Sequence, residues 1–263
     1  MLNGYAYIER KEKLKAKIPE LDIAYRSLIG DREEQQDCFG VFQNEKGTFA
    51  IVCDGMGGME AGSLASRVAV QIFAREIAHF REEAPAESML DILDRMDYSV
   101  YRKGQEKNIR TGTTAVFIYL REEKLYWCSV GDSRLYICRG NRMVSATRDH
   151  NYDLKLERMR REGTISQKEY LAEHGKGGRL LSYVGIKGIR IRDILREPFI
   201  LQKEDVLILC SDGLYKNVRE QQIQEIVCSR SNMEACALAL EEKVQLNASR
   251  QRDNTTFIMI KKK

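Results

Sequence analysis

The chain of 263 residues contains only three prolines, one tryptophan and three histidines. It has no segment rich in proline and serine that could act as a linker, so we expect one compact domain with a sizeable core. No run approaches the 18 consecutive apolar residues of a transmembrane helix, and the N-terminus lacks the apolar stretch of a secretory signal. These absences predict a cytoplasmic protein that does not interact with membranes.

The cysteines and histidines exclude several kinds of site. The seven cysteines are scattered and form no CxxC pair, which favours reduced thiols over a zinc site or a disulfide framework. No GxSxG or Cys/His motif accompanies the histidines, so nucleophilic catalysis with a histidine base has little support. A P-loop and a GxGxxG motif are also missing, and nothing indicates a nucleotide site.

The balance of charge does not indicate nucleic-acid binding. Lysine and arginine number 43 and aspartate and glutamate 39, giving a net charge of only +4. No aromatic RNA-binding motif or helix-turn-helix pattern is present, so we expect no nucleic-acid partner. The composition, 43% hydrophobic and 31% charged, is that of a folded globular protein.

The hydrophobic pattern predicts an α+β fold. Apolar runs predict strands at residues 23–29, 38–42, 49–53, 112–120, 124–130, 133–139, 142–146, 189–195, 206–210 and 255–260. Helical periodicity predicts helices at 60–77, 86–107, 219–228 and 233–246. This order favours helix pairs that cover a largely antiparallel core, with residues 112–139 forming an antiparallel meander.

Two segments differ from the rest of the predicted domain. Residues 1–20 are charged, and we expect a peripheral segment with one or two helical turns that precedes a single domain at 21–263. Residues 150–185 are polar, contain two short helical patterns, and are predicted to form a surface flap.

Four aspartates stand at the ends of strongly apolar runs. Asp54 follows FAIVC, Asp132 follows LYWCSVG, Asp212 follows VLILCS, and Asp253 precedes TTFIMI. A carboxylate at a buried strand end is costly unless it is hydrogen-bonded, paired or bound to a metal. Each acid could cap its own loop, and a lone Asp-Gly is most often a tight turn. Their recurrence favours convergence on a hard divalent cation, Mg²⁺ or Mn²⁺, which would relieve their mutual repulsion.

Such a centre would suit hydrolysis of a phosphate ester. An aspartate that bridges two ions is the usual geometry of two-metal hydrolases. Arg32, five residues before Asp37, has a planar guanidinium suited to phosphate oxygens, although a lone arginine of this kind is more often an ordinary surface residue.

Six ordered motifs resemble those of the metal-dependent protein serine/threonine phosphatases of type 2C, the PPM family. They are Arg32 with Asp37, VCDGMGG at 52–58, GTTA at 112–115, VGDSR at 130–134, LCSDGL at 209–214 and DNTT at 253–256. Each is weak alone, but six in this order are specific, and together they span residues 24–261. DGMGG in place of DGHGG is similar to the bacterial branch.

The resemblance implies a β-sandwich of two antiparallel sheets flanked by helix pairs, with the metal centre at one end. By matching position, Asp54 would bridge two ions, the Gly55 carbonyl would contact one, and Asp212 and Asp253 would contact the other. Asp132 would help Asp212 to hold a third, weaker ion. Asp37, Gln36 and Asn254 would lie next to the metal ligands or their water, Arg32 would bind the substrate phosphate, and residues 150–185 would border the cleft.

Two positions depart from the family pattern. Gln35-Gln36-Asp37 stands where the family usually has Asn-Glu-Asp, which removes one negative charge near the ions and should weaken their binding. Met56 stands where animal members have a histidine proposed as general acid, and a methionine cannot donate a proton.

The sequence therefore predicts a phosphoserine/phosphothreonine protein phosphatase in which a metal-bridging hydroxide attacks phosphorus in line. Phosphoprotein substrates and a cognate serine/threonine kinase are the expected partners, and a monomer is the expected state. The rival hypothesis is a pseudophosphatase that binds a kinase or phosphoprotein without turnover, and Gln36 is the residue that favours it. Specialisation for one regulatory partner, as in sporulation or stress-response relatives, also stays open.

Overall fold

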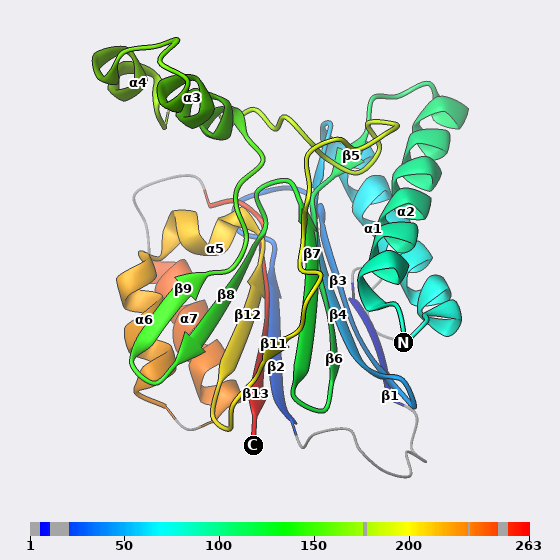
Figure 1. Ribbon diagram of the computed structural model, residues 1–263, viewed down its shortest axis with the longest axis vertical. Coiled ribbons are helices and arrows are strands. Elements are labelled where there is room, and N and C mark those ends of the chain that lie inside the picture. The colour runs from blue at the N-terminus through cyan, green and yellow to red at the C-terminus, as the bar shows by residue number, and fades with distance from the viewer. Residues whose placement is uncertain (1–5, 11–20, 176–177, 231, 247–251) are drawn as a thin grey trace.

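Two β-sheets pack face to face and helices cover the outer face of each, so that the protein has four layers (Figure 1). The computed structural model describes residues 6–10, 21–175, 178–230, 232–246 and 252–263. The architecture is the predicted α+β sandwich with flanking helix pairs, and this prediction is confirmed.

The first sheet has the strand order β1-β3-β4-β6-β7-β10, with β5 paired to β4 and β11 to β7. Its strands are β1 (Ala6–Arg10), β3 (Asp37–Asn44), β4 (Gly47–Met56), β5 (Gly112–Thr113), β6 (Ala115–Arg121), β7 (Lys124–Val130), β10 (Asp193–Ile194) and β11 (Phe199–Ile200). Of the strand expected at 189–195, only β10 pairs with the sheet, two residues long.

Strand β1 is a departure from the sequence prediction. Helical turns were expected within residues 1–20, but Ala6–Arg10 forms a strand that pairs in parallel with β3, since the edge of β3 offers unpaired backbone groups. The rest of that expected segment, 1–5 and 11–20, lies outside the described residues. The other pairings in this sheet are antiparallel among the described strands.

The second sheet is antiparallel, with the order β2-β13-β12-β8-β9. Its strands are β2 (Leu21–Leu28), β8 (Arg134–Arg139), β9 (Arg142–Ser145), β12 (Val206–Cys210) and β13 (Thr255–Lys262). The predicted meander over 112–139 is therefore wrong at its third strand. After Gly131, whose φ is +97°, the chain crosses to the other sheet, where β8 pairs with the apolar strand β12 along its full length.

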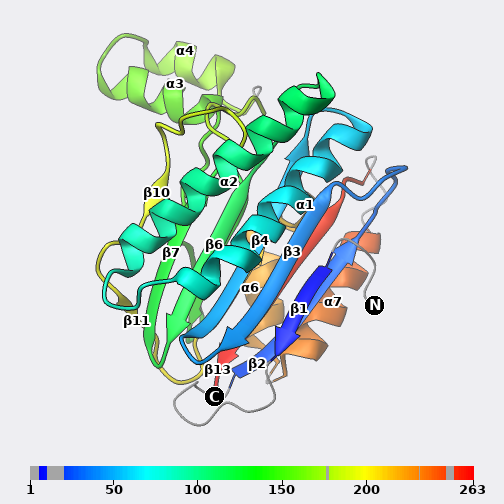
Figure 2. The same ribbon diagram turned by 90° about the vertical axis from the view of Figure 1, so that its right-hand side faces the viewer.

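Helices flank both sheets as expected. Over the first sheet lie α1 (Met59–Glu76), the 3₁₀ turn η1 (Ile77–His79) and α2 (Pro85–Lys107), as Figure 2 shows. Beside the second lie α5 (Asp212–Asn217), α6 (Glu220–Cys228) and α7 (Met233–Leu246). Helices α3 (Tyr152–Arg161) and α4 (Gln167–Glu173) extend away from the sandwich. Helix α5 was not predicted, because six residues are too few to show a helical period.

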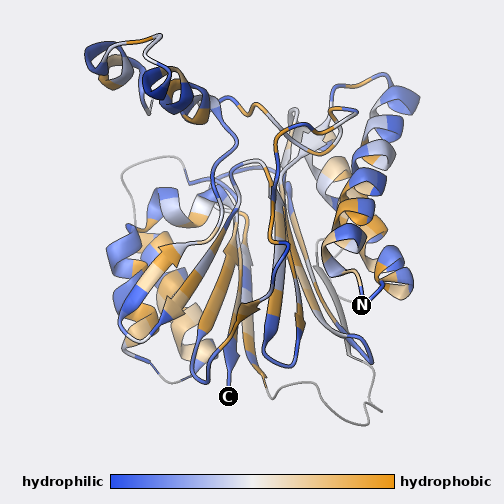
Figure 3. Ribbon diagram, viewed as in Figure 1, coloured by the Kyte–Doolittle hydropathy of each residue, from blue (hydrophilic) through white to orange (hydrophobic). Residues whose placement is uncertain are grey.

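Hydrophobic residues are concentrated in the strands of the two sheets (Figure 3). Three hydrophobic clusters fill the space between the layers. One joins the first sheet to α1 and α2, where Phe73 packs against Phe49 and Phe117. Another joins the second sheet to α6 and α7, and the third fills the space between the sheets. Because both faces of the central strands are buried, those strands have continuous apolar runs.

The topology directs several chain segments to one end of the sandwich. Strand β4 ends where its antiparallel partner β3 begins, and β12 ends where β13 begins. The turn from β7 to β8 reaches the same end, since Arg134 pairs with Cys210 at the end of β12. Polar residues at these strand ends are therefore brought together although they are far apart in sequence.

Candidate metal centre

The acids predicted from the strand ends meet at this end of the sandwich. Asp37 begins β3 and stands opposite Asp54 of β4 in the ladder. Asp132 lies in the turn between β7 and β8, and Asp212 is the first residue of α5. Asp54, Asp132 and Asp212 line one cleft of about 760 Å³.

The mutual effects of these acids on their pKa values show that they form one electrostatic group. Burial, reinforced by the charges of Asp212 and Asp253, raises the pKa of Asp37 to about 7. Burial, reinforced by Asp37, Asp212 and Asp132, raises the pKa of Asp54 well above its usual value. Burial and then Asp212 raise the pKa of Asp132 to about 7. The site therefore disfavours the charged forms of Asp37, Asp54 and Asp132, and the charges of Asp212 and Asp253 contribute to this effect.

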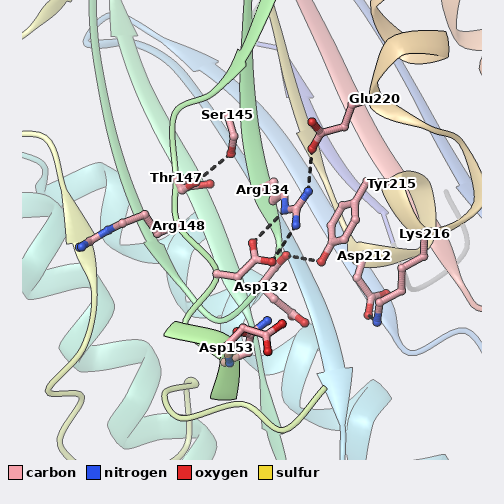
Figure 4. Close-up of polar contacts among 12 residues, drawn as sticks. Asp132, Arg134, Ser145, Thr147, Arg148, Asp153, Asp212, Tyr215, Lys216 and Glu220 are labelled. Carbon is pink, nitrogen blue, oxygen red and sulfur yellow. Dashed lines mark hydrogen bonds and ion pairs between the residues drawn. The ribbon is translucent and has the colours of Figure 1, made fainter. Parts of the chain in front are cut away.

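Two cations of the chain partly neutralise the group. Arg32 makes a bidentate ion pair with Asp253, with Nε–Oδ1 and Nη2–Oδ2 distances of 2.9 and 2.8 Å. Lys216, one turn after Asp212 on α5, makes an ion pair with it, as the close-up shows (Figure 4). The charges of Asp212, Asp132 and Asp54 raise the pKa of Lys216 although its burial acts in the opposite direction.

The glycines after two of the acids are required by close packing. A Cβ on Gly55 would lie 2.1 Å from the carbonyl oxygen of Gly62 and 2.7 Å from that of Gln36. A Cβ on Gly213 would lie 2.1 Å from the carbonyl oxygen of Asn254. Both Asp-Gly pairs therefore mark places where backbone meets backbone at the rim of the core.

Hydrogen bonds hold the acid-bearing loops together. The Asn254 side chain accepts a hydrogen bond from the backbone N–H of Gln36 at 2.8 Å and donates one to the backbone carbonyl of Ile29 at 2.8 Å. Ser211 Oγ donates to Asp37 Oδ2 at 2.8 Å, while Asp37 Oδ1 is buried without a partner. Asn254 thus ties the loop before β13 to the loop before β3.

A second network fixes the turn that carries Asp132. Tyr215 on α5 donates its hydroxyl to the Asp132 carbonyl at 2.9 Å (Figure 4). The Arg134 guanidinium lies 3.6 Å from the centre of the Tyr215 ring and bonds Asp149 through two nitrogens, both at 2.8 Å. It also donates to Glu220 at 2.9 Å, which connects this turn to α6.

The group suits a hard divalent ion in its donor chemistry. The donors are carboxylate oxygens, they are crowded, and one oxygen of Asp37 is buried without a partner. As the side chains are oriented, no three His, Cys, Asp or Glu residues in the described part of the chain surround one metal position. In this arrangement Asp212 is paired with Lys216, and Asp253 is paired with Arg32.

The comparisons with known proteins bear on the same residues. The family model described as protein phosphatase 2C matches residues 29–254, which include all the acids above. The chain belongs to the protein phosphatase 2C family. This family is metal-dependent, in agreement with the oxygen donors of the site.

Individual relatives agree with the assignment. A protein named serine/threonine phosphatase stp from Listeria innocua is 31% identical over 238 residues, covering 88% of this chain and 91% of the relative. Protein phosphatase PhpP from Streptococcus pneumoniae is 27% identical over 80% of this chain and 85% of its own. The solved S. agalactiae serine/threonine phosphatase, 23% identical, superposes with a TM-score of 0.78 over 93% of this chain and all of its own, and so has the same fold.

The predicted family and its bacterial branch are confirmed. The match identifies a protein serine/threonine phosphatase and favours the catalytic hypothesis over the pseudophosphatase. Among the described residues, no helix is long and apolar enough to cross a membrane.

The two departures from the family pattern have clear positions in this phosphatase. The Gln36 side chain lies beside Gly62 at the start of α1, where a Cβ on Gly62 would come within 2.9 Å of its amide oxygen. Met56 lines the cleft, and its thioether cannot donate a proton.

Sequence reasoning missed several residues of the site. The Thr114 hydroxyl accepts from the Asp54 amide at 2.9 Å, and the Thr113 hydroxyl donates to the Asp54 carbonyl at 2.9 Å. Both belong to the GTTA motif, to which no role was assigned. Lys216 was missed because its signal, a spacing of four from Asp212, has meaning only on the unpredicted helix α5.

Proposed function

We propose that this phosphatase hydrolyses phosphoserine and phosphothreonine esters of other proteins at the carboxylate cluster, with Mn²⁺ or Mg²⁺ as cofactor. The observation that carries the proposal is the meeting of aspartates at one end of the sandwich. Asp54, Asp132 and Asp212 line one cleft there, and burial together with the charges of neighbouring acids raises the pKa values of Asp37, Asp54 and Asp132. Divalent cations are the partners that relieve such crowding.

Each acid has a proposed role. Asp54 and the Gly55 carbonyl would hold one ion, and Asp54, Asp212 and Asp253 the second. Asp132 and Asp212 would hold a third, weaker ion. When bound, the ions supply positive charge for the phosphoryl oxygens and lower the pKa of water. Asp37 would lie next to the metal ligands or their water. It stands opposite Asp54 in the ladder and accepts a hydrogen bond from Ser211, while its other carboxylate oxygen has no partner among the described residues.

Arg32 is proposed to bind the substrate phosphate. Its guanidinium is half-exposed, and the two N–H groups that pair with the Asp253 carboxylate also match the geometry of phosphate oxygens. An ion at Asp253 would compete with Arg32 for the carboxylate, so metal binding would release the guanidinium toward substrate. Since Met56 cannot protonate the leaving group, that proton must come from water or another group.

The surroundings of the cleft suit a protein substrate. Tyr152, Lys155 and Arg179, all from residues 150–185, line it, which supports the proposal that this segment is a flap of the single domain at 21–263. All seven cysteines are free thiols, which supports a reducing, cytoplasmic location. We propose further that the phosphatase acts as a monomer opposite a cognate serine/threonine kinase.

The test is a phosphatase assay with p-nitrophenyl phosphate and with pSer, pThr and pTyr peptides, in Mn²⁺, in Mg²⁺ and with EDTA. We expect metal-dependent turnover, a preference for pSer and pThr peptides, and loss of activity with EDTA. Asp54→Asn and Asp212→Asn should lose most turnover, whereas Asp91→Asn, an exposed acid on α2, should not. Wild-type rates in both site variants would refute the proposal.

Gln36 is the residue that favours the alternative function, a pseudophosphatase that binds its partner without turnover. Calorimetric titration of the metal-free protein with Mn²⁺ separates the two functions. Tight binding that is lost in Asp54→Asn supports catalysis, and absence of binding together with absence of turnover supports a pseudophosphatase.

A further inference from the structure

A second groove lies next to the catalytic cleft, on the far side of Met56. It has a volume of about 510 Å³, in the range of ligand-binding clefts. Met56, Tyr183 and Ile186 line both hollows, so the groove continues the cleft. Gly57, three residues after Asp54, packs against the Arg110 backbone, where a Cβ would come within 2.6 Å of the carbonyl oxygen. A bound peptide that leaves the cleft on this side would enter the groove.

One wall of the groove is preformed. Asp97 on α2, 4% exposed, accepts hydrogen bonds from the amides of Gly185, Lys187 and Gly188 at 2.7, 3.2 and 2.6 Å. These bonds hold the loop at 185–188 against α2. Lys187 then lies with its ammonium 4.9 Å from the centre of the Tyr101 ring.

The floor of the groove is shaped by glycine. A Cβ on Gly112 would come within 2.5 Å of the Tyr183 ring and 2.9 Å of Met56 Cε. The absence of a side chain at Gly112 lets the Tyr183 ring and the Met56 thioether lie side by side, and both line the groove. The groove therefore has apolar and aromatic surface that an extended peptide can cover.

The charged groups of the groove are of one sign. Arg110 lines it, and within the described residues its guanidinium makes no hydrogen bond or ion pair. Lys187 does not line the groove, but its ammonium lies over the ring of Tyr101, which does. No acidic residue is among the described residues that line it, and Glu106 nearby is paired with Lys103 at 2.7 Å. A free arginine beside an apolar floor favours a ligand with carboxylates.

We infer that this groove binds the segment of the phosphoprotein substrate next to the phosphorylated residue, and that Arg110 selects acidic residues there. The inference rests on the proposed function, since it names the substrate class of the same site. Arg110 is a specificity-determining residue and does not contact the reacting phosphate.

The experiment uses three phosphoserine peptides that differ only in their flanks, with three glutamates before the phosphoserine, three after it, or glutamines on both sides. For the wild type, kcat/KM on one acidic peptide should exceed that on the glutamine peptide about fivefold, as for one partly exposed charge pair. Arg110→Glu should abolish or invert this preference, while hydrolysis of p-nitrophenyl phosphate stays unchanged. Added salt should reduce the preference.

Arg102→Glu is the control variant, because Arg102 lies near the end of α2, is exposed, and does not line the groove. It should keep the wild-type preference. The inference is overturned if the wild type has no preference, if Arg110→Glu keeps it, or if Arg102→Glu loses it equally.

Failure of the proposed function would be recognised separately, by absence of turnover on p-nitrophenyl phosphate. In that event, fluorescence anisotropy with peptides that carry a phosphonate in place of the phosphate ester decides the question without turnover. Tighter binding of an acidic peptide that Arg110→Glu removes supports the groove, and equal binding of all three peptides refutes it.

Discussion

Single residues set the charge of this site, and Lys216 is the clearest case. Its ammonium is paired with Asp212 and is influenced by the charge of Asp132, and these two acids are the proposed ligands of the third ion. The charge of Asp54, a proposed ligand of the other two ions, also acts on it. The positive charge of Lys216 therefore acts on the same acids that would bind the added metal ion. Since two like charges repel, Lys216 should weaken metal binding at Asp212.

We predict that Lys216→Met binds Mn²⁺ more tightly than the wild type, by about three- to tenfold, because it removes this repulsion at similar side-chain length. Isothermal titration of the metal-free proteins measures the change. Lys203→Met, an exposed lysine in the turn before β12, should match the wild type. Weaker binding by Lys216→Met would mean that the lysine supports the ligands instead of competing with the ion.

At the scale of elements, short loops anchored to helices build the substrate side of the site. The loop at 185–188 contains Lys187, Gly185 and Gly188 at φ values of +64°, +102° and +100°, which are costly for lysine. The three hydrogen bonds to Asp97 offset that cost. The wall of the groove thus depends on one buried carboxylate of α2.

We predict that Asp97→Ala destabilises the protein by about 2–3 kcal/mol, because three backbone amides lose a charged acceptor. Urea denaturation gives the free energy of unfolding, and hydrogen exchange at residues 185–188 should become faster. Asp94→Ala, one turn earlier and exposed, should change neither quantity appreciably. Unchanged exchange in Asp97→Ala would show that the loop is held by other contacts.

For the molecule as a whole, the acid cluster links stability to pH. The folded state raises the pKa of Asp37 to about 7, above its value in the unfolded chain, so the folded state binds the proton more tightly. Stability from this group is then greatest below about pH 4 and falls as the pH rises through 7. Bound divalent cations should oppose this loss, because they stabilise the ionised cluster.

We predict that the metal-free protein is less stable at pH 8 than at pH 5, and that Asp37→Asn reduces this difference by about 2–3 kcal/mol. Urea denaturation in EDTA at both pH values measures it, and Mn²⁺ should restore more stability at pH 8 than at pH 5. A difference between pH 5 and pH 8 that is the same in Asp37→Asn and the wild type would contradict the raised pKa.

Local patterns determined most of the elements and the members of the acid cluster. Apolar runs predicted β7 and β12 to the residue. In β12 the run is continuous, because a strand buried on both faces needs apolar side chains at every position. An acid directly after such a run, as at Asp54, marks a strand end at the rim of a core. Gln36 and Met56 were also visible, as residue types that depart from a motif.

Only the tertiary structure decided how those elements meet. Local sequence does not say that β8 leaves the sheet of β7, because pairing depends on which apolar strand is available across the core. Local sequence also does not say that Arg32 pairs with Asp253, that Lys216 pairs with Asp212, or that Arg110 lines the groove next to the cleft. These are relations between distant segments, set by packing and by long-range charge, and they exist only once the chain has folded.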